Sequence, residues 1–470
     1  MKQDEFELAW LPELVYTGGR FESGVALLCD WSGRIAGLAR ASEVGDGKLV
    51  RLKHRAILPG LVNGHSHAFQ RVIRGRTEYR TGKGSDDFWT WREMMYRAAT
   101  RLSPADLYDA SRMIFLEMAL GGITSCAEFH YIHHAPDGVP YDDPNLLSKT
   151  VIRAALDVGL KICLLRVSYA RSGFATEPNP RQLRFIEEDP QSFLSHADSL
   201  RAEVAKAHAG RAWVGLAPHS VRAVPLDYLR ECFRYAEEHQ LPVHMHVAEQ
   251  PAEIEACMKE HKRTPVALLE TEGLLSERFT GVHGIHINVE ETRALARARS
   301  LVCACPTTER NLGDGIVPAE LLFQEGVRVS LGTDSHTQAD LLEDARELEY
   351  NMRLQKLERV VLNRTSDEPS ALAASLFDSA TRHGAESIGI RGGGTLEAGQ
   401  AADFFTVDLH HPSIAGAAPE DLLAHIVFSL PASAVRETVV GGRMIIEDGH
   451  HRSEREIIEK FIALQKRLWS

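Results

Sequence analysis

Two histidines separated by one residue, His65 and His67, follow a short apolar segment near residue 60. In an extended backbone, residues two apart point to the same side, so both imidazoles can reach one metal ion. Taken alone, the pair is a weak signal, because two surface histidines in a polar loop would look the same. It becomes informative only if further ligands occur at comparable positions along the chain.

Such groups do follow later apolar segments. His244 and His246 end one segment, with Glu249 three residues further on, His283 ends the next, and Asp334 ends the last within LGTDS. Singly, His283 could be a core histidine and Asp334 could cap the next helix. Jointly, three imidazoles and one carboxylate suit Zn²⁺ or another borderline divalent ion that activates a water molecule. Glu249 could then carry the water proton to a leaving nitrogen, and His283 could hold the water or polarise the substrate.

The segments that must position these groups read as eight apolar strands, at residues 56–63, 124–129, 161–168, 212–218, 242–248, 280–284, 301–306 and 327–333. Amphipathic helical stretches lie between most of them; residues 103–122, for example, carry a Ser cap, a Pro in the first turn and a final Gly pair. This alternation predicts an α/β fold, a closed parallel (β/α)8 TIM barrel over residues 58–385. Catalytic groups of such barrels gather at the C-terminal strand ends, where the groups above fall.

The two ends of the chain differ from its middle. Residues 1–57 and 386–470 read as short β segments broken by turns, and the second range ends in a helical stretch at 455–468. We expect them to meet as one small β-sandwich side domain with a C-terminal helix. The longest irregular stretches are predicted around 70–100, 131–146 and 170–190, each after a strand and thus over the catalytic face.

Composition excludes several classes of protein. The 470 residues are 44% hydrophobic and 25% charged, as in an ordinary globular protein, and the net charge of −12 argues against nucleic-acid and anionic-membrane partners. No apolar run approaches the roughly 20 residues of a membrane helix, and MKQDEFELAW lacks a signal-peptide core. With seven scattered cysteines, including Cys303 and Cys305 on an apolar strand, we expect reduced buried thiols and a cytoplasmic protein.

The stretches PGLVNGHSHAF, HMHVAE, GVHG and LGTDS resemble the signature stretches of the amidohydrolase superfamily, in its deaminase branch, over almost the whole chain. The resemblance implies catalytic roles for Glu249 as proton shuttle, His283 and Asp334, with His244 supporting. Binuclear members carry a bridging carboxylated Lys at the end of the fourth strand, where this chain has APHSVR. A single divalent ion, with Zn²⁺ the first candidate, is therefore expected on the implied ligands His65, His67, His246 and Asp334.

Within that branch, HSHAFQRVIRGRTE, DDFWTWREMMY, AEFHYIHH and APHSVRAV most resemble the formiminoglutamate deiminases of bacterial histidine degradation. This family hydrolyses N-formimino-L-glutamate to N-formyl-L-glutamate and ammonia. An anionic substrate with two carboxylates agrees with two arginines in loops after strands, because the guanidinium fork pairs with a carboxylate through two hydrogen bonds. The implied substrate contacts are Gln70, Arg92, Tyr131, His219 and Arg222.

Several alternatives stay open at this point. Arg92 could be a surface helix residue in a salt bridge, and His130, His133 and His134 compete with Tyr131 for the same loop. The substrate could be another amidine, a guanidino compound or an aromatic amine, and the ligand types suit Fe or Mn as well as Zn. A non-catalytic scaffold would be expected to have lost metal ligands, and none is missing. We expect a homodimer, since barrels of this sort often dimerise.

Overall fold

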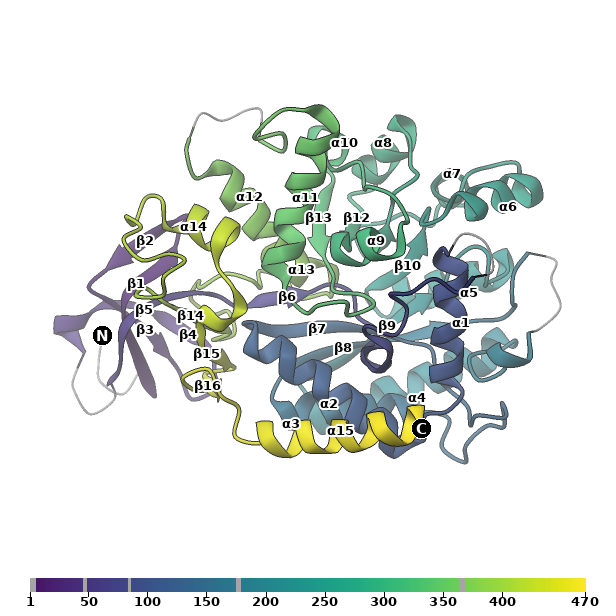
Figure 1. Cartoon of the computed structure of the whole chain (residues 1–470), viewed down its shortest axis with the longest axis horizontal. Coiled ribbons are helices and arrows are strands. Elements are labelled where there is room, and N and C mark those ends of the chain that lie inside the picture. Colours follow the sequence, from purple (N-terminus) through teal and green to yellow (C-terminus); the bar gives the residue numbers. More distant parts are fainter. Residues whose placement is uncertain (1–5, 45–48, 83–85, 175–178, 364–367) are drawn as a thin grey trace.

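The computed structural model describes residues 6–44, 49–82, 86–174, 179–363 and 368–470. Figure 1 shows a small sheet-built body at the N-terminal end and a larger body of strands and helices beside it. The larger body contains the predicted barrel, and the smaller one contains strands from both ends of the chain. Among the described residues, no helix combines the length and the hydropathy needed to cross a membrane.

Seven of the eight predicted barrel strands are confirmed, and the first is confirmed for its last part, Leu61–Asn63. They pair in parallel in one sheet whose order follows the sequence from first to last. The strands are buried almost throughout, which explains their near-continuous apolar sequences. They are β6 (Leu61–Asn63), β7 (Ile123–His130), β8 (Lys161–Ser168), β9 (Ala212–Pro218), β10 (Val243–Val247), β11 (Phe279–His283), β12 (Leu301–Ala304) and β13 (Arg328–Leu331).

Helices connect these strands and cover the barrel. The longest predicted one, α2 (Pro104–Leu120), begins at Ser103 in a reciprocal capping box with Asp106 and ends at Gly121, as its sequence indicated. The other connecting helices are α3 (Leu146–Val158), α4 (Pro190–His208), α5 (Leu226–Glu238), α6 (Pro251–His261), α7 (Pro265–Thr271), α8 (Val289–Arg297), α9 (Pro306–Leu312), α10 (Ala319–Gln324), α11 (Leu341–Lys356), α12 (Ala371–Ala380) and α13 (Arg382–Ser387).

The prediction of an irregular stretch around residues 70–100 is wrong in its second half. There α1 (Phe88–Ala99) begins at Asp87, which forms a capping box with Thr90. One face of this helix lines a cavity through Trp91, Arg92 and Tyr96. The stretches at 131–146 and 170–190 contain, among their described residues before α4, only one short 3-10 helix, η4 (Pro180–Gln182).

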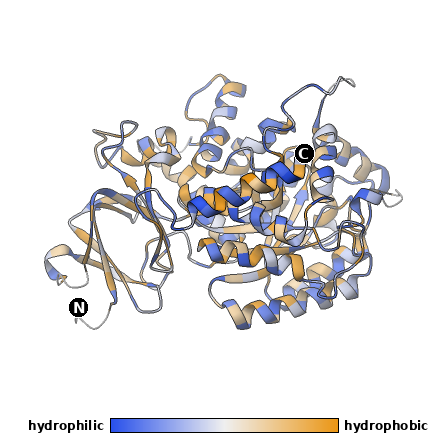
Figure 2. Ribbon diagram, turned by 60° about the horizontal axis from the view of Figure 1, so that its bottom comes forward, coloured by the Kyte–Doolittle hydropathy of each residue, from blue (hydrophilic) through white to orange (hydrophobic). Residues whose placement is uncertain are grey.

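The side domain is built from both chain ends, as predicted. Its eight strands belong to one hydrogen-bonded sheet. Strand β5 pairs in parallel with β1 and antiparallel with β14, and so joins the two ends. The sheet curls around a core that includes Trp10, Leu27, Phe404 and Val439 (Figure 2). Its strands are β1 (Leu8–Thr17), β2 (Arg20–Ser23), β3 (Val25–Cys29), β4 (Ile35–Arg40), β5 (Leu49–Pro59), β14 (Phe404–Asp408), β15 (Val435–Val440) and β16 (Arg443–Ile446).

Gly60 separates the side sheet from the barrel. The apolar run at 56–63 reads as one strand in the sequence, but β5 ends at Pro59 in the side sheet and β6 begins at Leu61 in the barrel. A Cβ atom at Gly60 would lie 2.3 Å from the Thr124 hydroxyl oxygen, so no larger residue fits at this crossing. The exact domain boundaries at 57/58 and 385/386 stay a prediction.

The C-terminal helix α15 (Glu454–Trp469) lies on the barrel, although we grouped it with the side domain. It contacts α2 and runs beneath the barrel helices in Figure 1. Arg112 of α2 donates to Glu456 at 3.0 Å, and Gln465 donates to the carbonyl of Val72 at 3.0 Å. Helix α14 (Leu422–Ser429), which precedes α15 along the chain, contacts α11 and α12. The seven cysteines are buried and free.

Candidate metal centre and substrate pocket

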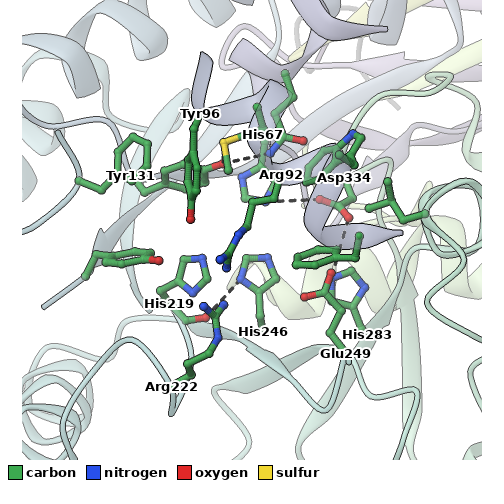
Figure 3. Close-up of a pocket in the computed structure, with 17 residues that line it drawn as sticks. His67, Arg92, Tyr96, Tyr131, His219, Arg222, His246, Glu249, His283 and Asp334 are labelled. Atoms are coloured by element: carbon green, nitrogen blue, oxygen red, sulfur yellow. Dashed lines mark hydrogen bonds and ion pairs between the residues drawn. The ribbon is translucent and has the colours of Figure 1, made fainter. Parts of the chain in front are cut away.

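Four predicted ligands meet at the C-terminal end of the barrel. Figure 3 shows three of them, His67, His246 and Asp334. His65 and His67 follow β6, His246 lies in β10 and Asp334 follows β13. The Nε2 atom of His65 lies 3.2 Å from Nε2 of His67 and 3.2 Å from Nε2 of His246. The Asp334 Oδ1 atom lies 3.4 Å from His65 Nε2 and 3.3 Å from His67 Nε2.

Hydrogen bonds on the far side of two rings direct their lone pairs toward this centre. His67 donates from Nδ1 to the carbonyl of Phe129 at 2.9 Å, and His246 donates from Nδ1 to the carbonyl of His219 at 3.2 Å. Each Nε2 of these neutral rings is therefore an acceptor. Ligands at 2.0–2.1 Å from a tetrahedral Zn²⁺ would lie about 3.3 Å apart. The residues thus fit a small divalent cation.

Burial sets the charge of the four ligands. It lowers the pKa of His65 to about 3 and also lowers the pKa values of His67 and His246, so the imidazoles are neutral at pH 7. For Asp334, burial raises the pKa, but the hydrogen bond from His65 and the nearby imidazoles outweigh burial and lower it. Three neutral imidazoles and one carboxylate carry a net charge of −1, which favours a cation.

His283 and Glu249 lie beside the ligands. His283 Nε2 is 3.6 Å from Glu249 Oε1 and 3.9 Å from Asp334 Oδ2, while its Nδ1 is 3.3 Å from Glu309 Oε1. Burial opposes the charged form of His283, but Glu249, Glu309 and Asp334 raise its pKa well above the ordinary value. Burial also raises the pKa of Glu249. This pair of side chains can therefore hold and transfer a proton next to the ligands.

One cavity contains the predicted substrate contacts. It opens above the ligand cluster and is lined by His67, His246, Glu249, His283 and Asp334. The structure brings all the predicted substrate side chains to its wall, together with several aromatic rings. These predicted residues are Gln70, Arg92, Tyr131, His219 and Arg222.

Two guanidinium groups face the cavity without an acidic partner. Among the described residues, neither Arg92 nor Arg222 has a carboxylate within 4.0 Å, and Arg92 Nη1 is buried without a hydrogen-bond acceptor. Arg92 instead lies over the rings of Trp89 and Tyr96, at 4.4 and 5.4 Å. Burial and the charge of Arg222 lower the pKa of Arg92. The alternative of a surface salt bridge for Arg92 is thus wrong, and the two cations together favour an anionic ligand.

Tyr131 faces the cavity, whereas the competing histidines point elsewhere. Its hydroxyl accepts a hydrogen bond from Gln70 at 3.0 Å. His133 donates to the carbonyl of Val167 at 2.8 Å and His134 donates to the carbonyl of Ile186 at 3.0 Å. None of His130, His133 and His134 lines the cavity. The placement therefore favours Tyr131 as the contact from this loop.

Sequence reasoning missed three polar residues of this region. Tyr96 and Tyr169 line the cavity, and Gln182 donates from its amide to both hydroxyls, at 2.7 and 2.5 Å. Tyr96 lies on the unpredicted helix α1, and Gln182 lies in the long loop after β8. Their only signal was that these stretches follow barrel strands.

Known proteins with similar sequences were compared with this chain. The model of the amidohydrolase family matches residues 56–445. A formimidoylglutamate deiminase from Pseudomonas aeruginosa is 37% identical over 411 residues, which cover 87% of this chain and 88% of that protein. A 5-methylthioadenosine/S-adenosylhomocysteine deaminase from Natronomonas pharaonis is 28% identical, over 84% of this chain and 83% of its own length.

Solved structures agree with these matches. An amidohydrolase from Brucella melitensis superposes with a TM-score of 0.90 at 30% identity, covering 98% of this chain and 100% of that one. An adenosine deaminase from Xanthomonas campestris with bound zinc has a TM-score of 0.81 at 18% identity, with 98% of each chain covered, which supports the fold. The chain therefore belongs to the amidohydrolase family, and it is a hydrolase that acts on carbon–nitrogen bonds.

Proposed function

We propose that this chain is a metal-dependent deiminase that hydrolyses N-formimino-L-glutamate to N-formyl-L-glutamate and ammonia, a step of histidine degradation. One observation carries the proposal: two guanidinium groups without carboxylate partners, Arg92 and Arg222, face the cavity that also holds the three-histidine, one-aspartate cluster. The substrate supplies the two missing carboxylates and a formimino carbon. The 37% identity to the Pseudomonas aeruginosa formimidoylglutamate deiminase supports the same activity.

The residues that would hold the metal are His65, His67, His246 and Asp334. A bound divalent ion, with Zn²⁺ the first candidate, supplies Lewis acidity and lowers the pKa of a water molecule. Asp334 Oδ2 lies 3.9 Å from His283 Nε2, and in this proposal Asp334 accepts a proton from that water while the protonated His283 donates a hydrogen bond to it. The cytoplasmic location and the homodimer expected from the sequence stay predictions.

The remaining residues position the substrate and move its proton. Arg92 and Arg222 bind the two carboxylates, and this fixes the formimino carbon above the ligand cluster. Water adds to that carbon, and Glu249, 3.6 Å from His283, delivers a proton to the terminal nitrogen. The carbon–nitrogen bond to this nitrogen breaks, ammonia leaves, and the oxygen of water remains as the formyl oxygen.

Ammonia release from a panel of substrates tests the proposal. The purified protein is expected to turn over N-formimino-L-glutamate and to release little ammonia from 5-methylthioadenosine, S-adenosylhomocysteine, guanine or cytosine. Treatment with a chelator should abolish turnover, and Zn²⁺ should restore it. Strong turnover of a nucleoside or base without turnover of formiminoglutamate would contradict the proposed substrate.

A second candidate keeps the reaction class and changes the substrate to an aromatic amine. The rings of Trp91, Tyr96, Tyr169 and Phe185 line the cavity and could stack on a base. The similarity to the Natronomonas pharaonis deaminase gives this candidate a second support. It predicts that Arg92→Ala leaves substrate preference unchanged, whereas the first candidate predicts a large loss toward the dicarboxylate.

A further inference from the structure

The first and last strands of the barrel meet where the metal site lies. β6 and β13 are the two ends of the strand order, and no ladder pairs them among the described residues. The seam has a few backbone hydrogen bonds, such as Gly64 N–H to the Leu331 carbonyl at 2.8 Å and Asp334 N–H to the His65 carbonyl at 3.1 Å. His65 and His67 lie on one side of this seam and Asp334 on the other. The ligand cluster is therefore split across the closure.

A continuous chain of side-chain hydrogen bonds crosses the same seam. Asn63 Nδ2 lies 2.7 Å from Thr333 Oγ1, and Thr333 Oγ1 lies 3.1 Å from His336 Nδ1. His336 Nε2 in turn lies 3.1 Å from Ser66 Oγ, and Ser66 Oγ lies 2.7 Å from Glu128 Oε2. All five side chains are buried.

One backbone group fixes the direction of the first bond in this chain. The Thr333 N–H donates to Asn63 Oδ1 at 3.0 Å, which leaves the Asn63 amide nitrogen to donate to Thr333 Oγ1. The Thr333 hydroxyl keeps a proton that it can donate to His336 Nδ1. In the tautomer that accepts this proton, His336 donates from Nε2 to Ser66.

The chain ends on an acid. Ser66 accepts from His336 and donates its own proton to Glu128, whose second oxygen accepts from the Ala68 N–H at 2.8 Å. The five side chains therefore link the two loops through consecutive hydrogen bonds.

The backbone at this seam adopts a conformation that side chains disfavour. Asp334 and His336 have φ values of 42° and 59°, in the left-handed region that non-glycine residues seldom occupy. Such residues persist when the surrounding contacts determine their position. The hydrogen bonds of His336, on both ring nitrogens, supply that determination two residues after the ligand Asp334.

We propose that Ser66 and His336 are positioning residues, whose hydrogen bond across the seam holds the loop of His65 and His67 in register with the loop of Asp334 for metal binding. The inference rests on the metal site of the proposed function, but not on its substrate. Neither side chain lines the cavity, so both act through the ligands. Residues that orient metal ligands typically contribute 10–100-fold to metal affinity.

Zinc affinity measured by competition with a chromophoric chelator tests this role on the full-length protein. Ser66→Ala is expected to weaken Zn²⁺ binding about 10–100-fold. Ser125→Ala is the matched control, because Ser125 is a buried serine of β7 whose hydroxyl has no partner among the described residues. At saturating Zn²⁺, Ser66→Ala should lower kcat and leave KM unchanged, since Arg92 lies on helix α1 and Arg222 follows β9, and neither takes part in this chain of hydrogen bonds.

A double variant separates positioning from general destabilisation. Ser66→Ala and His336→Asn are each expected to weaken Zn²⁺ binding. If both residues act through one hydrogen bond, the fold-loss of affinity in the double variant should be smaller than the product of the two single fold-losses. Ser66→Thr, which keeps the hydroxyl, should recover most of the affinity. Wild-type affinity in both single variants would overturn the proposal.

Failure of the proposed function would look different. A wild-type protein that binds Zn²⁺ tightly but does not turn over formiminoglutamate would refute the proposed substrate alone. A wild-type protein that binds no divalent ion would refute the metal site and the positioning role together.

Discussion

Two groups of buried histidines in this barrel have the same protonation state and opposite arrangements. Burial lowers the pKa of His65 at the ligand cluster and of His133 in the loop after β7 to about 3 in each case. His133 and His134 each donate from Nε2 to a different backbone carbonyl, so their Nε2 atoms do not converge. The Nε2 atoms of His65, His67 and His246 instead converge.

The comparison shows that a neutral buried imidazole is not by itself a sign of a metal site. Burial is the largest cause of the lowered pKa in both groups. The distinguishing feature is the direction of the lone pairs, which a backbone carbonyl fixes for His67 and His246 by accepting the Nδ1 proton. Adjacent charge differs too. The loop histidines lie over the paired Arg166 and Glu187, whereas the ligand cluster faces guanidinium groups without partners.

Removing a ligand should have the largest effect. Asp334→Asn takes away the only negative charge of the cluster, and we expect it to lower kcat by about 10⁴-fold, equal to about 5 kcal/mol, because the ion supplies several kcal/mol of transition-state stabilisation. Metal content by elemental analysis and ammonia release are the measurements. His133→Gln, in the other histidine group, should keep both the metal and the activity. Equal losses in the two variants would remove the distinction between the groups.

Removing one unpaired cation should come next. Arg92→Ala is expected to reduce kcat/KM for formiminoglutamate by about 3 kcal/mol, mostly through KM, because a substrate carboxylate would be left without its partner in a buried cavity. Arg181→Ala, which removes an exposed arginine paired with Glu93, serves as the control. Steady-state kinetics on both variants decide the point, and an unchanged KM in Arg92→Ala would exclude a carboxylate contact.

Removing the carboxylate partner of the buried Arg166 should lower the stability of the protein and leave its activity unchanged. Glu187 accepts from Arg166 at 3.1 Å and from His196 at 2.7 Å, and both residues of the Arg166–Glu187 pair are buried. Glu187→Gln should lower the free energy of unfolding by about 2–3 kcal/mol, since it leaves a buried guanidinium without its counter-ion. Urea unfolding measures this change. Metal affinity should not change.

The same pair gives a pH dependence with a definite sign. Burial raises the pKa of Glu187, but His133, His196 and Arg166 outweigh it, and the net shift is downward from 4.5. A pKa that is lower in the folded than in the unfolded state stabilises the folded protein at pH values above the unfolded pKa. This stabilisation is lost as the pH falls through the folded pKa. Below about pH 4.5 the wild type should therefore lose more stability than Glu187→Gln. Parallel unfolding curves for the two proteins down to pH 3 would contradict this.

The smallest effect is expected at the loop histidines. His134→Gln exchanges one hydrogen bond to the Ile186 carbonyl for a longer amide donor, so the unfolding free energy should change by about 1 kcal/mol. Zinc affinity should equal that of the wild type. Loss of metal in this variant would show that the two histidine groups are coupled.

Much of the barrel could be predicted because strands buried on both faces leave a continuous apolar trace in the sequence. The side sheet was predictable from its turn-rich texture at both ends. What failed was decided by contacts between distant segments. The Thr124 side chain leaves no room for a Cβ atom at Gly60, where the two sheets separate, and the C-terminal helix packs on α2. No local pattern reports either contact.

The site was predictable where its residues follow strands and hidden where they do not. His65, His246, His283 and Asp334 follow or end apolar runs, and their convergence follows from barrel geometry. Glu309 lies on α9, where an acid in the first turn of a helix has an ordinary explanation. Its contact with His283 Nδ1 appears only once α9 is placed against β11.

The position of β5 between β1 and β14 sets an order of events during synthesis. β5 is complete by residue 59, whereas its antiparallel neighbour β14 begins at Phe404. A ribosome adding roughly 5–20 residues per second needs tens of seconds to cover that distance. During this interval one edge of β5 has no strand beside it, and it is the kind of edge that recruits foreign strands. A chaperone that shields emerging N-terminal segments would therefore matter most before the last fifth of the chain leaves the ribosome.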